Sequence, residues 1–404
     1  MTSGTTTLKR SLNTPLLTLY GLGVTVGAGI YVLIGEAAAL AGPFAWLSFL
    51  AAAIVVGFTA LSYTELSTRY PISAGEAVYV EKGFGRPMLA TGVGMLVAFS
   101  GMVSAAAIAV GASGYLAGLI AVPDTAGVVP IVLLMGILAW WGITQSVTTA
   151  AVVTVLELLG LMTVIYWGFS TADTSGLALS DMMPTAAWSD WNGIIGATVL
   201  AFFAFVGFED MVNVAEEVKD PRRTLPRAIL ITLVVATVLY VATCLAVLMS
   251  VPLDELATSG EPLALVFADA PVVVQSGFSA LAIVATVNGV LIQIIMSSRI
   301  FYGIAARGNL PAAFARLSPR TRTPTVATGF VTLAIIVLAS LFPIGSLASW
   351  TSQIVLVVFV LVNASLIAIK SQGQDRQTSH FDVPLLFPIA GLILSLTLLA
   401  VSLL

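Results

Sequence analysis

The stretch GLGVTVGAGIYVLIG, Gly21 to Gly35, interrupts the first apolar run of the chain with glycines. Its centre, Gly27-Ala28-Gly29, lies where a spanning helix would cross the middle of a bilayer. Glycine costs a helix about 1 kcal/mol relative to alanine. Unwound backbone at that depth is tolerated only where protein or a wet cavity receives it. The stretch therefore predicts two half-helices, one ending near Val26 and one starting near Ile30, with close packing through Gly23 and Gly27 as the alternative.

Composition places the rest of the chain in lipid. Of 404 residues, 58% are apolar and 9% are charged, against about 25% charged in soluble domains. Spanning a bilayer takes about 20 apolar residues. We therefore expect an all-α polytopic membrane protein with a single transmembrane domain, 1–404, and about eleven spans. These spans are 16–41, 43–68, 87–120, 127–146, 149–170, 192–218, 226–251, 272–306, 325–342, 345–369 and 384–403.

The basic residues orient these spans. All 16 Lys and Arg residues lie before the first span, in alternate connections or in the span ends that flank these connections, as Arg299 does, on one predicted side. The opposite connections carry acids such as Asp181 and Asp254 and no basic residue. Because cytoplasmic loops collect Lys and Arg, this pattern predicts a cytoplasmic N-terminus in a plasma membrane protein. An odd number of spans then places the C-terminus outside.

The stretch FFAFVGFED, Phe202 to Asp210, interrupts the sixth predicted span. The first and sixth spans open two successive five-helix sets, about 15–170 and 191–370, and an odd set size makes these sets inverted repeats. The helix at about 384–404 is then peripheral. Paired interrupted helices in inverted halves indicate a transporter with a midplane substrate site, as in the LeuT-type fold. Half-helix ends there suit the carboxylate and the ammonium of an amino acid.

Four stretches resemble one family over nearly the whole chain. They are GAGIYVLIG from Gly27, YPISAGEAVYVEKGFG from Tyr70, FFAFVGFEDMVNVAEEVKDPRRTLPRAI from Phe202 and SSRIFYGIAARGNLP from Ser297. The chain is similar to the amino acid/polyamine/organocation (APC) superfamily of permeases, nearest its branch of cationic amino acid transporters. Many members have twelve or more helices, whereas about eleven are expected here. The resemblance implies secondary active transport of an amino acid.

The resemblance also implies a substrate site. The substrate carboxylate would meet the backbone at Gly27, Ala28 and Gly29, carbonyls near Thr25, Phe203, Ala204 and Val206 would take the amino group, and Phe203 would cover the site. The complete expected set of substrate-binding residues is Thr25, Gly27, Ala28, Gly29, Ile30, Phe203, Ala204, Phe205 and Val206.

Glu157 is an acid inside the apolar run of the fifth span, where burial is costly and favours a function or a partner. The resemblance places it where several proton-coupled relatives have a lysine, near Ser297 and Ser298, whose hydroxyls match a sodium site. The expected coupling ion is H⁺, with Na⁺ as the second choice; an exchanger or a transporter-like amino acid sensor is a further alternative. A structural Glu157, protonated and hydrogen-bonded, is also open.

Other classes find less support in the sequence. A net charge of −4 gives no basic footprint for nucleic acid. A single cysteine, Cys244, excludes an intrachain disulfide and a cysteine metal cluster, and no nucleotide loop or metal motif indicates an enzyme or a cofactor. Pro221 and Pro226 predict a loop before the seventh span. The oligomeric state and the amino acid carried are not indicated, although a mostly apolar lining favours neutral substrates.

Overall fold

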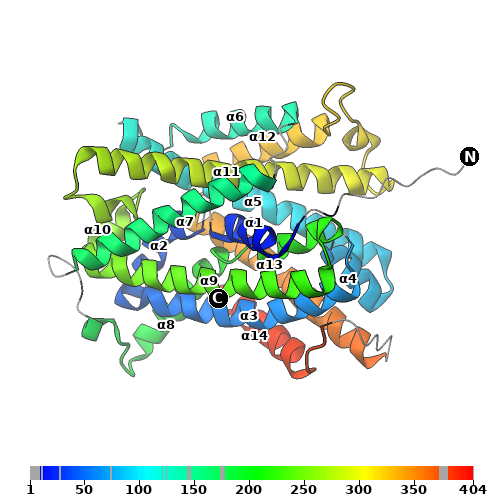
Figure 1. The fold of residues 1–404 in the computed structure, drawn as a ribbon, viewed down its shortest axis with the longest axis horizontal. Helices are drawn as coiled ribbons and strands as arrows, with labels where there is room; N and C mark the ends of the chain where they lie inside the picture. The colour runs from blue at the N-terminus through cyan, green and yellow to red at the C-terminus, as the bar shows by residue number, and fades with distance from the viewer. Residues whose placement is uncertain are drawn as a thin grey trace, which may run out of the picture.

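The computed structural model describes residues 10, 12–26, 29–72, 75–120, 122, 123, 125–142, 147–172, 177, 179–372 and 381–403. Over these residues the chain is all-helical (Figure 1), and an isolated bridge between Leu12 and Val218 is the one β-type pairing. The all-α prediction is thereby confirmed.

The α-helices are α1 (Thr14–Val26), α2 (Gly29–Ala41), α3 (Ala45–Arg69), α4 (Gly75–Phe84), α5 (Pro87–Ile120), α6 (Val128–Trp141), α7 (Val147–Ser170), α8 (Trp188–Phe203), α9 (Pro221–Ser250), α10 (Leu253–Thr258), α11 (Val272–Ala306), α12 (Thr325–Leu341), α13 (Ile344–Ser371) and α14 (Leu386–Ser402). Short 3₁₀ helices are η1 (Gly42–Phe44), η2 (Leu179–Met182), η3 (Phe208–Glu217), η4 (Ala264–Phe267) and η5 (Ala312–Ala315).

Seven helical stretches of the described residues are long and apolar enough to cross a membrane. One of them, Thr14–Arg69, takes in α1, α2 and α3. Three further apolar helices, α6, α12 and α14, are shorter. Large apolar side chains such as Trp141 and Tyr166 are 72% and 73% exposed, as expected where lipid covers the protein. The chain is a multi-pass membrane protein, and the number eleven stays a prediction.

The predicted helices 87–120 and 272–306 match α5 and α11 to the residue. The predicted loop at Pro221 and Pro226 is wrong, because α9 begins at Pro221 and contains Pro226. Proline suits the first position of a helix, where its missing N–H has no partner in any case. Pro226 follows in the second turn, where it removes a single backbone hydrogen bond.

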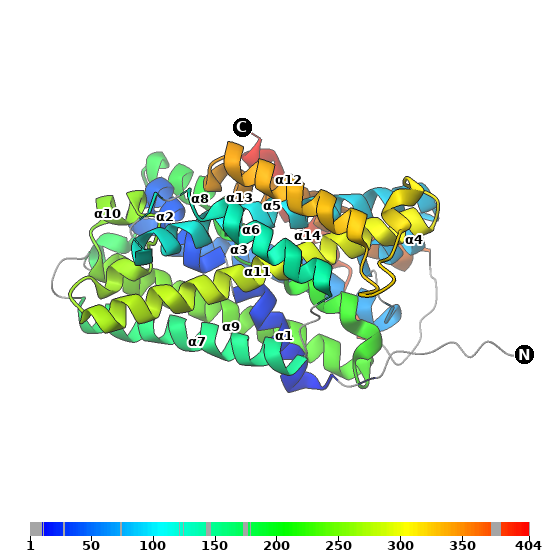
Figure 2. The ribbon, with the colours of Figure 1, turned by 90° about the horizontal axis from the view of Figure 1, so that it is seen from above.

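The first helices lie inside the bundle. The helix α1 packs against α7, α9 and η3, whereas α2 packs against α8 and α10. Long helices α5 and α11 pack against each other, and α13 packs against α5 (Figures 1 and 2). At one edge α14 packs on α13 and α3, and α6 pairs with α12 at another. The described residues on either side of position 27 and those around Ala204 are therefore flanked by long helices.

Candidate functional site

The segments in which the sequence predicts the two interruptions lie close together. The description of α1 stops at Val26 and that of α2 starts at Gly29; the expected site residues Gly27 and Ala28, and with them the predicted break, lie outside the described residues. The helix α8 ends at Phe203, and η3 begins at Phe208 after Gly207, whose φ of +121° favours glycine. A Cβ on Gly29 would come within 2.3 Å of Ala204 Cα, and one on Gly207 within 2.8 Å of the Val24 oxygen. The backbone at Gly29 thus lies close to that at Ala204, and the backbone at Gly207 lies close to that at Val24.

Tyr240 of α9 joins α1 to the residue that follows α8. Its hydroxyl lies 2.7 Å from the backbone oxygen of Thr25 and 2.7 Å from that of Ala204. A phenol has one proton to donate, so it serves one of these carbonyls at a time. The Phe205 ring packs edge-on against the Tyr240 ring at 5.0 Å. Sequence reasoning missed Tyr240, because nothing in an apolar helix marks which tyrosine reaches a distant carbonyl.

A small cavity of about 20 Å³ lies against the interruptions, which is room for a water-sized group. Of the expected site residues, Thr25, Gly29, Phe203 and Val206 line it. The Thr25 hydroxyl is buried and has no hydrogen-bond partner, so a polar group faces this space unsatisfied. The other described members of the set, Ile30, Ala204 and Phe205, are buried but do not line it.

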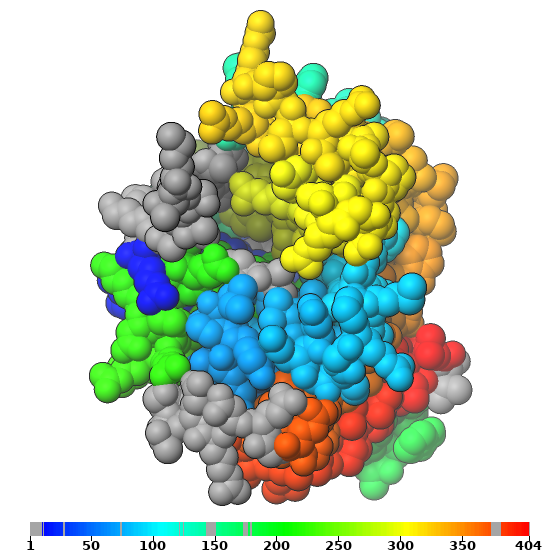
Figure 3. All heavy atoms as spheres, turned by 90° about the vertical axis from the view of Figure 1, so that its right-hand side faces the viewer, coloured from blue at the N-terminus to red at the C-terminus, as the bar shows by residue number. Residues whose placement is uncertain are grey.

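A larger cavity of about 720 Å³ reaches the small one from one end of the molecule, and Gly23, Val24 and Ile292 line both. We call it the vestibule. Its outer lining includes Glu217 and Arg307. Figure 3 shows this end hollowed between α4 (light blue), the start of α9 (green) and the segment of η5 (yellow). A vestibule of this volume lies within the range of small-molecule sites.

The opposite approach is covered by aromatic side chains. The rings of Tyr31 and Phe278 stack at 6.2 Å, and Phe267 packs on Phe278 at 4.7 Å. Tyr115 packs edge-on against Phe278 and donates to the backbone oxygen of Tyr31 at 2.7 Å. The structure is therefore open toward the vestibule and covered on the other side.

Glu157 of α7 is 1% exposed, and neither of its carboxyl oxygens has a hydrogen bond of good geometry. The polar side chain that interacts with it is the Asn288 amide of α11. Tyr31 donates to the backbone oxygen of Glu157 at 2.8 Å, which ties α7 to α2. Sequence reasoning found Glu157 from its charge but missed Asn288.

The expected partners of Glu157 on α11 make other contacts. The Ser297 hydroxyl donates to the backbone oxygen of Ala98 on α5 at 3.1 Å, and the Ser298 hydroxyl donates to Ile295 of its own helix at 3.0 Å. Both side chains are buried. Ser297 lies nine residues beyond Asn288, which is about 14 Å along a helix. Glu157 thus lies closer to Asn288 than to the serine pair.

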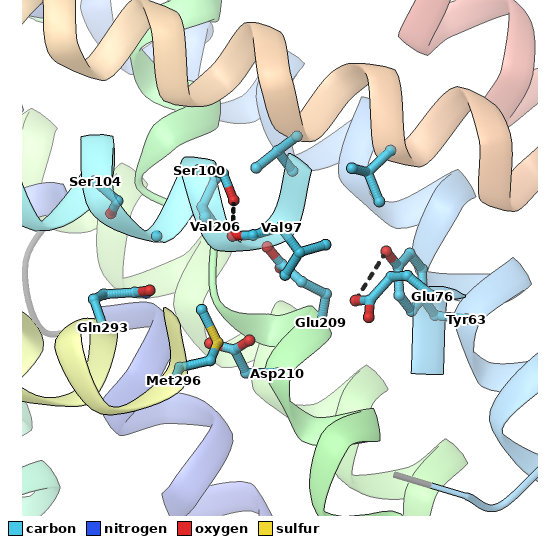
Figure 4. Close-up of a pocket in the computed structure, with 13 residues that line it drawn as sticks. Tyr63, Glu76, Val97, Ser100, Ser104, Val206, Glu209, Asp210, Gln293 and Met296 are labelled. Atoms are coloured by element: carbon cyan, nitrogen blue, oxygen red, sulfur yellow. Dashed lines mark hydrogen bonds between the residues drawn. The ribbon is translucent and has the colours of Figure 1, made fainter. Parts of the chain in front are cut away.

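A second small cavity, also about 20 Å³, lies beside the first (Figure 4). Three acids line it, Glu76 of α4 and Glu209 and Asp210 of η3. The Tyr63 hydroxyl donates to Glu76 Oε1 at 3.3 Å, and the Gly207 N–H donates to Glu209 Oε2 at 2.8 Å. Burial raises the pKa of Glu76 to about 7, although hydrogen bonds from its own backbone and from Tyr63 lower it. Sequence reasoning did not single out Glu76, because it is one of several charged residues in the connection between the predicted spans 43–68 and 87–120.

The sequence matches the pattern that defines the amino acid permease family over residues 12–404. It is 29% identical to the branched-chain amino acid permease BcaP of Bacillus subtilis, over 93% of this chain and 84% of that protein. It is 29% identical to the vacuolar cationic amino acid transporter 4 of Arabidopsis thaliana, over 91% of this chain but only 64% of that protein. It is 27% identical to the methylthioribose transporter of Bacillus subtilis, over 93% of this chain and 84% of that protein.

Proposed function

The chain belongs to the amino acid permease family, and from this premise we propose that it is a secondary active transporter of amino acids. The family and the names of the relatives point to a transporter and not to an enzyme. The observation that carries the proposal is the close approach of the backbone at Gly29 to that at Ala204, beside a cavity that continues into the vestibule.

The proposed binding mode uses backbone groups. If the helix is broken before Gly29 as proposed, the first N–H groups of α2 have no partner within the helix and suit the substrate carboxylate. Gly27 and Ala28 complete this part of the proposed site. Carbonyls near Thr25, Phe203, Ala204 and Val206 accept from the ammonium group, and Phe203 covers it. A side chain at Gly29 would occupy the space that the carboxylate requires.

In the proposed mechanism, the substrate site opens in turn to the two sides of the membrane. In the proposed cycle, the present structure is the state open to the vestibule, and the Tyr31, Tyr115 and Phe278 cluster is the gate that opens in the other state. A LeuT-type arrangement of two inverted five-helix repeats supports such a change, because one repeat rocks against the other around a fixed site.

Glu157 is the proposed coupling group, with H⁺ as the ion. A carboxyl group about 15 Å from the start of α7, counted from Val147, is expensive as a charge in the membrane. Its lack of a well-formed hydrogen bond leaves it able to gain and lose a proton as its surroundings change. Sodium coupling, with Ser297 and Ser298 as ligands, is the second candidate; exchange and a sensor role follow if neither ion drives accumulation.

Topology is part of the proposal. We place the N-terminus in the cytoplasm and the C-terminus outside a plasma membrane, because the basic residues gather on one side. In a variant with Cys244 replaced, a cysteine at Asp181 should react with an impermeant thiol reagent from outside, and one at Arg223 should not. The reverse labelling would overturn this orientation.

The experiment that tests substrate and coupling begins with a thermal-stability screen of purified protein against the twenty amino acids. The stabilising amino acid is then offered to proteoliposomes under an imposed pH gradient or an imposed sodium gradient. We expect accumulation under the pH gradient with wild type and with the exposed control Glu255→Gln, and none with Glu157→Gln. Accumulation by Glu157→Gln equal to wild type would remove Glu157 from the coupling mechanism.

A further inference from the structure

Three arginines lie close together in the connection between η5 and α12. Arg316, Arg320 and Arg322 fall within seven residues, and all three side chains are exposed. Within the described residues, these side chains form no ion pair and no hydrogen bond. Lys370, on the same predicted side of the membrane, is instead paired with Glu65. The three guanidinium groups therefore have no counter-ion in the described part of the chain.

The helices around this connection supply no acid. The short helix η5 packs on α11 and α12, and α6 packs on both of these long helices. The helix α5 packs against α6, α11 and α12. None of these five elements contains Asp or Glu. The described residues around the connection thus carry positive charge only, which favours an anionic ligand.

A hydrogen-bonded turn presents two of the arginines. The Ser318 N–H donates to the backbone oxygen of Thr323 at 2.9 Å, and the Arg322 N–H donates to the backbone oxygen of Ser318 at 2.9 Å. Arg322 has a φ of +56°, a left-handed conformation that glycine adopts more readily than arginine. Strained residues of this kind gather at ligand sites. The turn thus keeps a charged side chain at a position that favours glycine.

This turn lies on the end of α6, beside two exposed tryptophans. The Thr323 hydroxyl donates to the backbone oxygen of Trp140 at 2.8 Å. Gly142, which follows α6, lies so close that a Cβ on it would come within 3.3 Å of the Thr321 oxygen. Trp140 and Trp141 are 54% and 72% exposed. Tryptophan favours the boundary between the acyl chains and the headgroups, so the turn lies at the level of the headgroups.

The helices α6 and α12 run side by side at the outer edge of the bundle (Figures 1 and 2). They comprise 14 and 17 residues. At 1.5 Å per residue they are about 21 and 26 Å long, against about 30 Å of hydrocarbon. Because short spans are accommodated by thinning of the bilayer, lipid headgroups are drawn toward the helix ends at this edge, where the turn lies.

We propose that Arg316, Arg320 and Arg322 bind the phosphate of an anionic phospholipid at the edge formed by α6 and α12. Guanidinium groups pair with phosphate oxygens through two parallel hydrogen bonds. Trp140 and Trp141 contact the acyl chains below the headgroup. The exposed rings and the short helices favour a lipid over a free phosphate, which would leave both tryptophans uncovered. This site lies apart from the cavities described above and does not depend on the proposed transport activity.

The lipid dependence of the thermal midpoint of detergent-purified protein tests this site. Phosphatidylglycerol and phosphatidylcholine with the same acyl chains are titrated separately, and glycerol 1-phosphate supplies the headgroup without the chains. We expect phosphatidylglycerol to raise the midpoint of wild type at a concentration about 10-fold lower than phosphatidylcholine requires. The double variant Arg320→Gln/Arg322→Gln should lose this preference. The control Lys82→Gln/Arg86→Gln, which removes two exposed charges around the start of α5, should keep it.

Wild type is decisive even if the double variant does not fold. Equal effective concentrations of the two lipids would overturn the proposal, and so would an equal effect of glycerol 1-phosphate, because the site would then take free phosphate. Loss of the preference in the control would assign it to the overall positive charge and would also contradict the proposal. Arg322→Gly relieves the strain in the turn, so a several-fold weaker preference in this variant reflects the missing guanidinium group. An unchanged preference in Arg322→Gly would exclude Arg322 from the site.

Discussion

Tyr240 donates from its hydroxyl to the backbone oxygen of Thr25 at 2.7 Å, so a side chain of α9 holds α1 beside Val26. The backbone oxygen of Ala204 lies at the same 2.7 Å from this hydroxyl. One phenol thus links α1 to the residue that follows α8. In the proposed site, a substrate ammonium group that takes one carbonyl leaves the hydroxyl for the other.

Replacing Tyr240 by phenylalanine should destabilise the protein, because two buried carbonyls lose their donor. An unsatisfied buried acceptor costs about 1–3 kcal/mol, which lowers the thermal midpoint by a few degrees. The control is Tyr166→Phe, whose side chain is 73% exposed on α7. Equal midpoints for Tyr240→Phe and wild type in the same detergent would contradict the role given to this hydroxyl.

Gly29→Ala should abolish most transport. The new Cβ would lie 2.3 Å from the Cα of Ala204, and backbone cannot step aside as a flexible side chain does. Overpacking of this kind costs about 1–3 kcal/mol or more and separates the two interruptions. The matched control is Gly57→Ala on α3, where a Cβ meets no atom within 4 Å. Initial uptake rates, normalised to the amount of inserted protein, should fall about 10-fold or more for Gly29→Ala only. Equal rates for both variants would show that the contact is dispensable.

Glu65 should be a strong determinant of stability. Its buried carboxylate pairs with Arg69 at 2.6 Å and with Lys370 of α13 at 2.9 Å, and it accepts from the Val383 N–H before α14. Removing one member of a buried ion pair costs about 3–5 kcal/mol, so Glu65→Gln should lower the thermal midpoint clearly. Asp382 also pairs with Lys370, at 2.7 Å, but its side chain is 66% exposed. Asp382→Asn should therefore cost about 1 kcal/mol or less. Similar decreases in the thermal midpoint of Glu65→Gln and Asp382→Asn would contradict this expected difference in stability.

Glu76 should make stability depend on pH. Burial raises its pKa from 4.5 to about 7, so the folded state binds its proton more tightly than the unfolded chain. Its contribution is fully present below about pH 4.5 and is lost as the pH rises through about 7, with a cost near 3 kcal/mol above it. The stability difference between Glu76→Gln and wild type should thus grow in favour of the variant from pH 5 to pH 8.

Thermal unfolding in detergent without substrate measures this difference, and Glu81→Gln, on the exposed side of α4, controls for the loss of a charge. A stability difference between Glu76→Gln and wild type that stays constant from pH 5 to pH 8 would show that Glu76 does not titrate in this range.

The sequence indicated the features of this fold that are local. Polar residues and prolines bound α5 and α11, so both helices were predicted to the residue. A glycine in an apolar run, Gly207, indicated where α8 ends. The loop predicted at Pro226 was wrong, because a proline in the second helical turn destabilises the helix too little to prevent one that starts at Pro221.

Contacts between helices that are distant along the chain could not be predicted from the sequence. Glu157 was recognisable as a charge in an apolar run, but its neighbour Asn288 lies on another helix whose facing side no periodicity reveals. The same holds for Gln293, an amide on α11 that lines the same cavity as Asp210. In lipid both faces of a helix are apolar, so the pattern that separates core from surface in soluble proteins is weak.

Counterflow tests the central claim most directly. Proteoliposomes are loaded with the unlabelled amino acid that stabilises the purified protein, then diluted into a trace of the same amino acid in labelled form, without any ion gradient. A carrier with a single alternating site produces a transient accumulation of label above the outside concentration. We predict this overshoot for wild type and Gly57→Ala, and its absence for Gly29→Ala and for protein-free liposomes. Wild-type liposomes in which label only equilibrates, or never enters, would contradict the account.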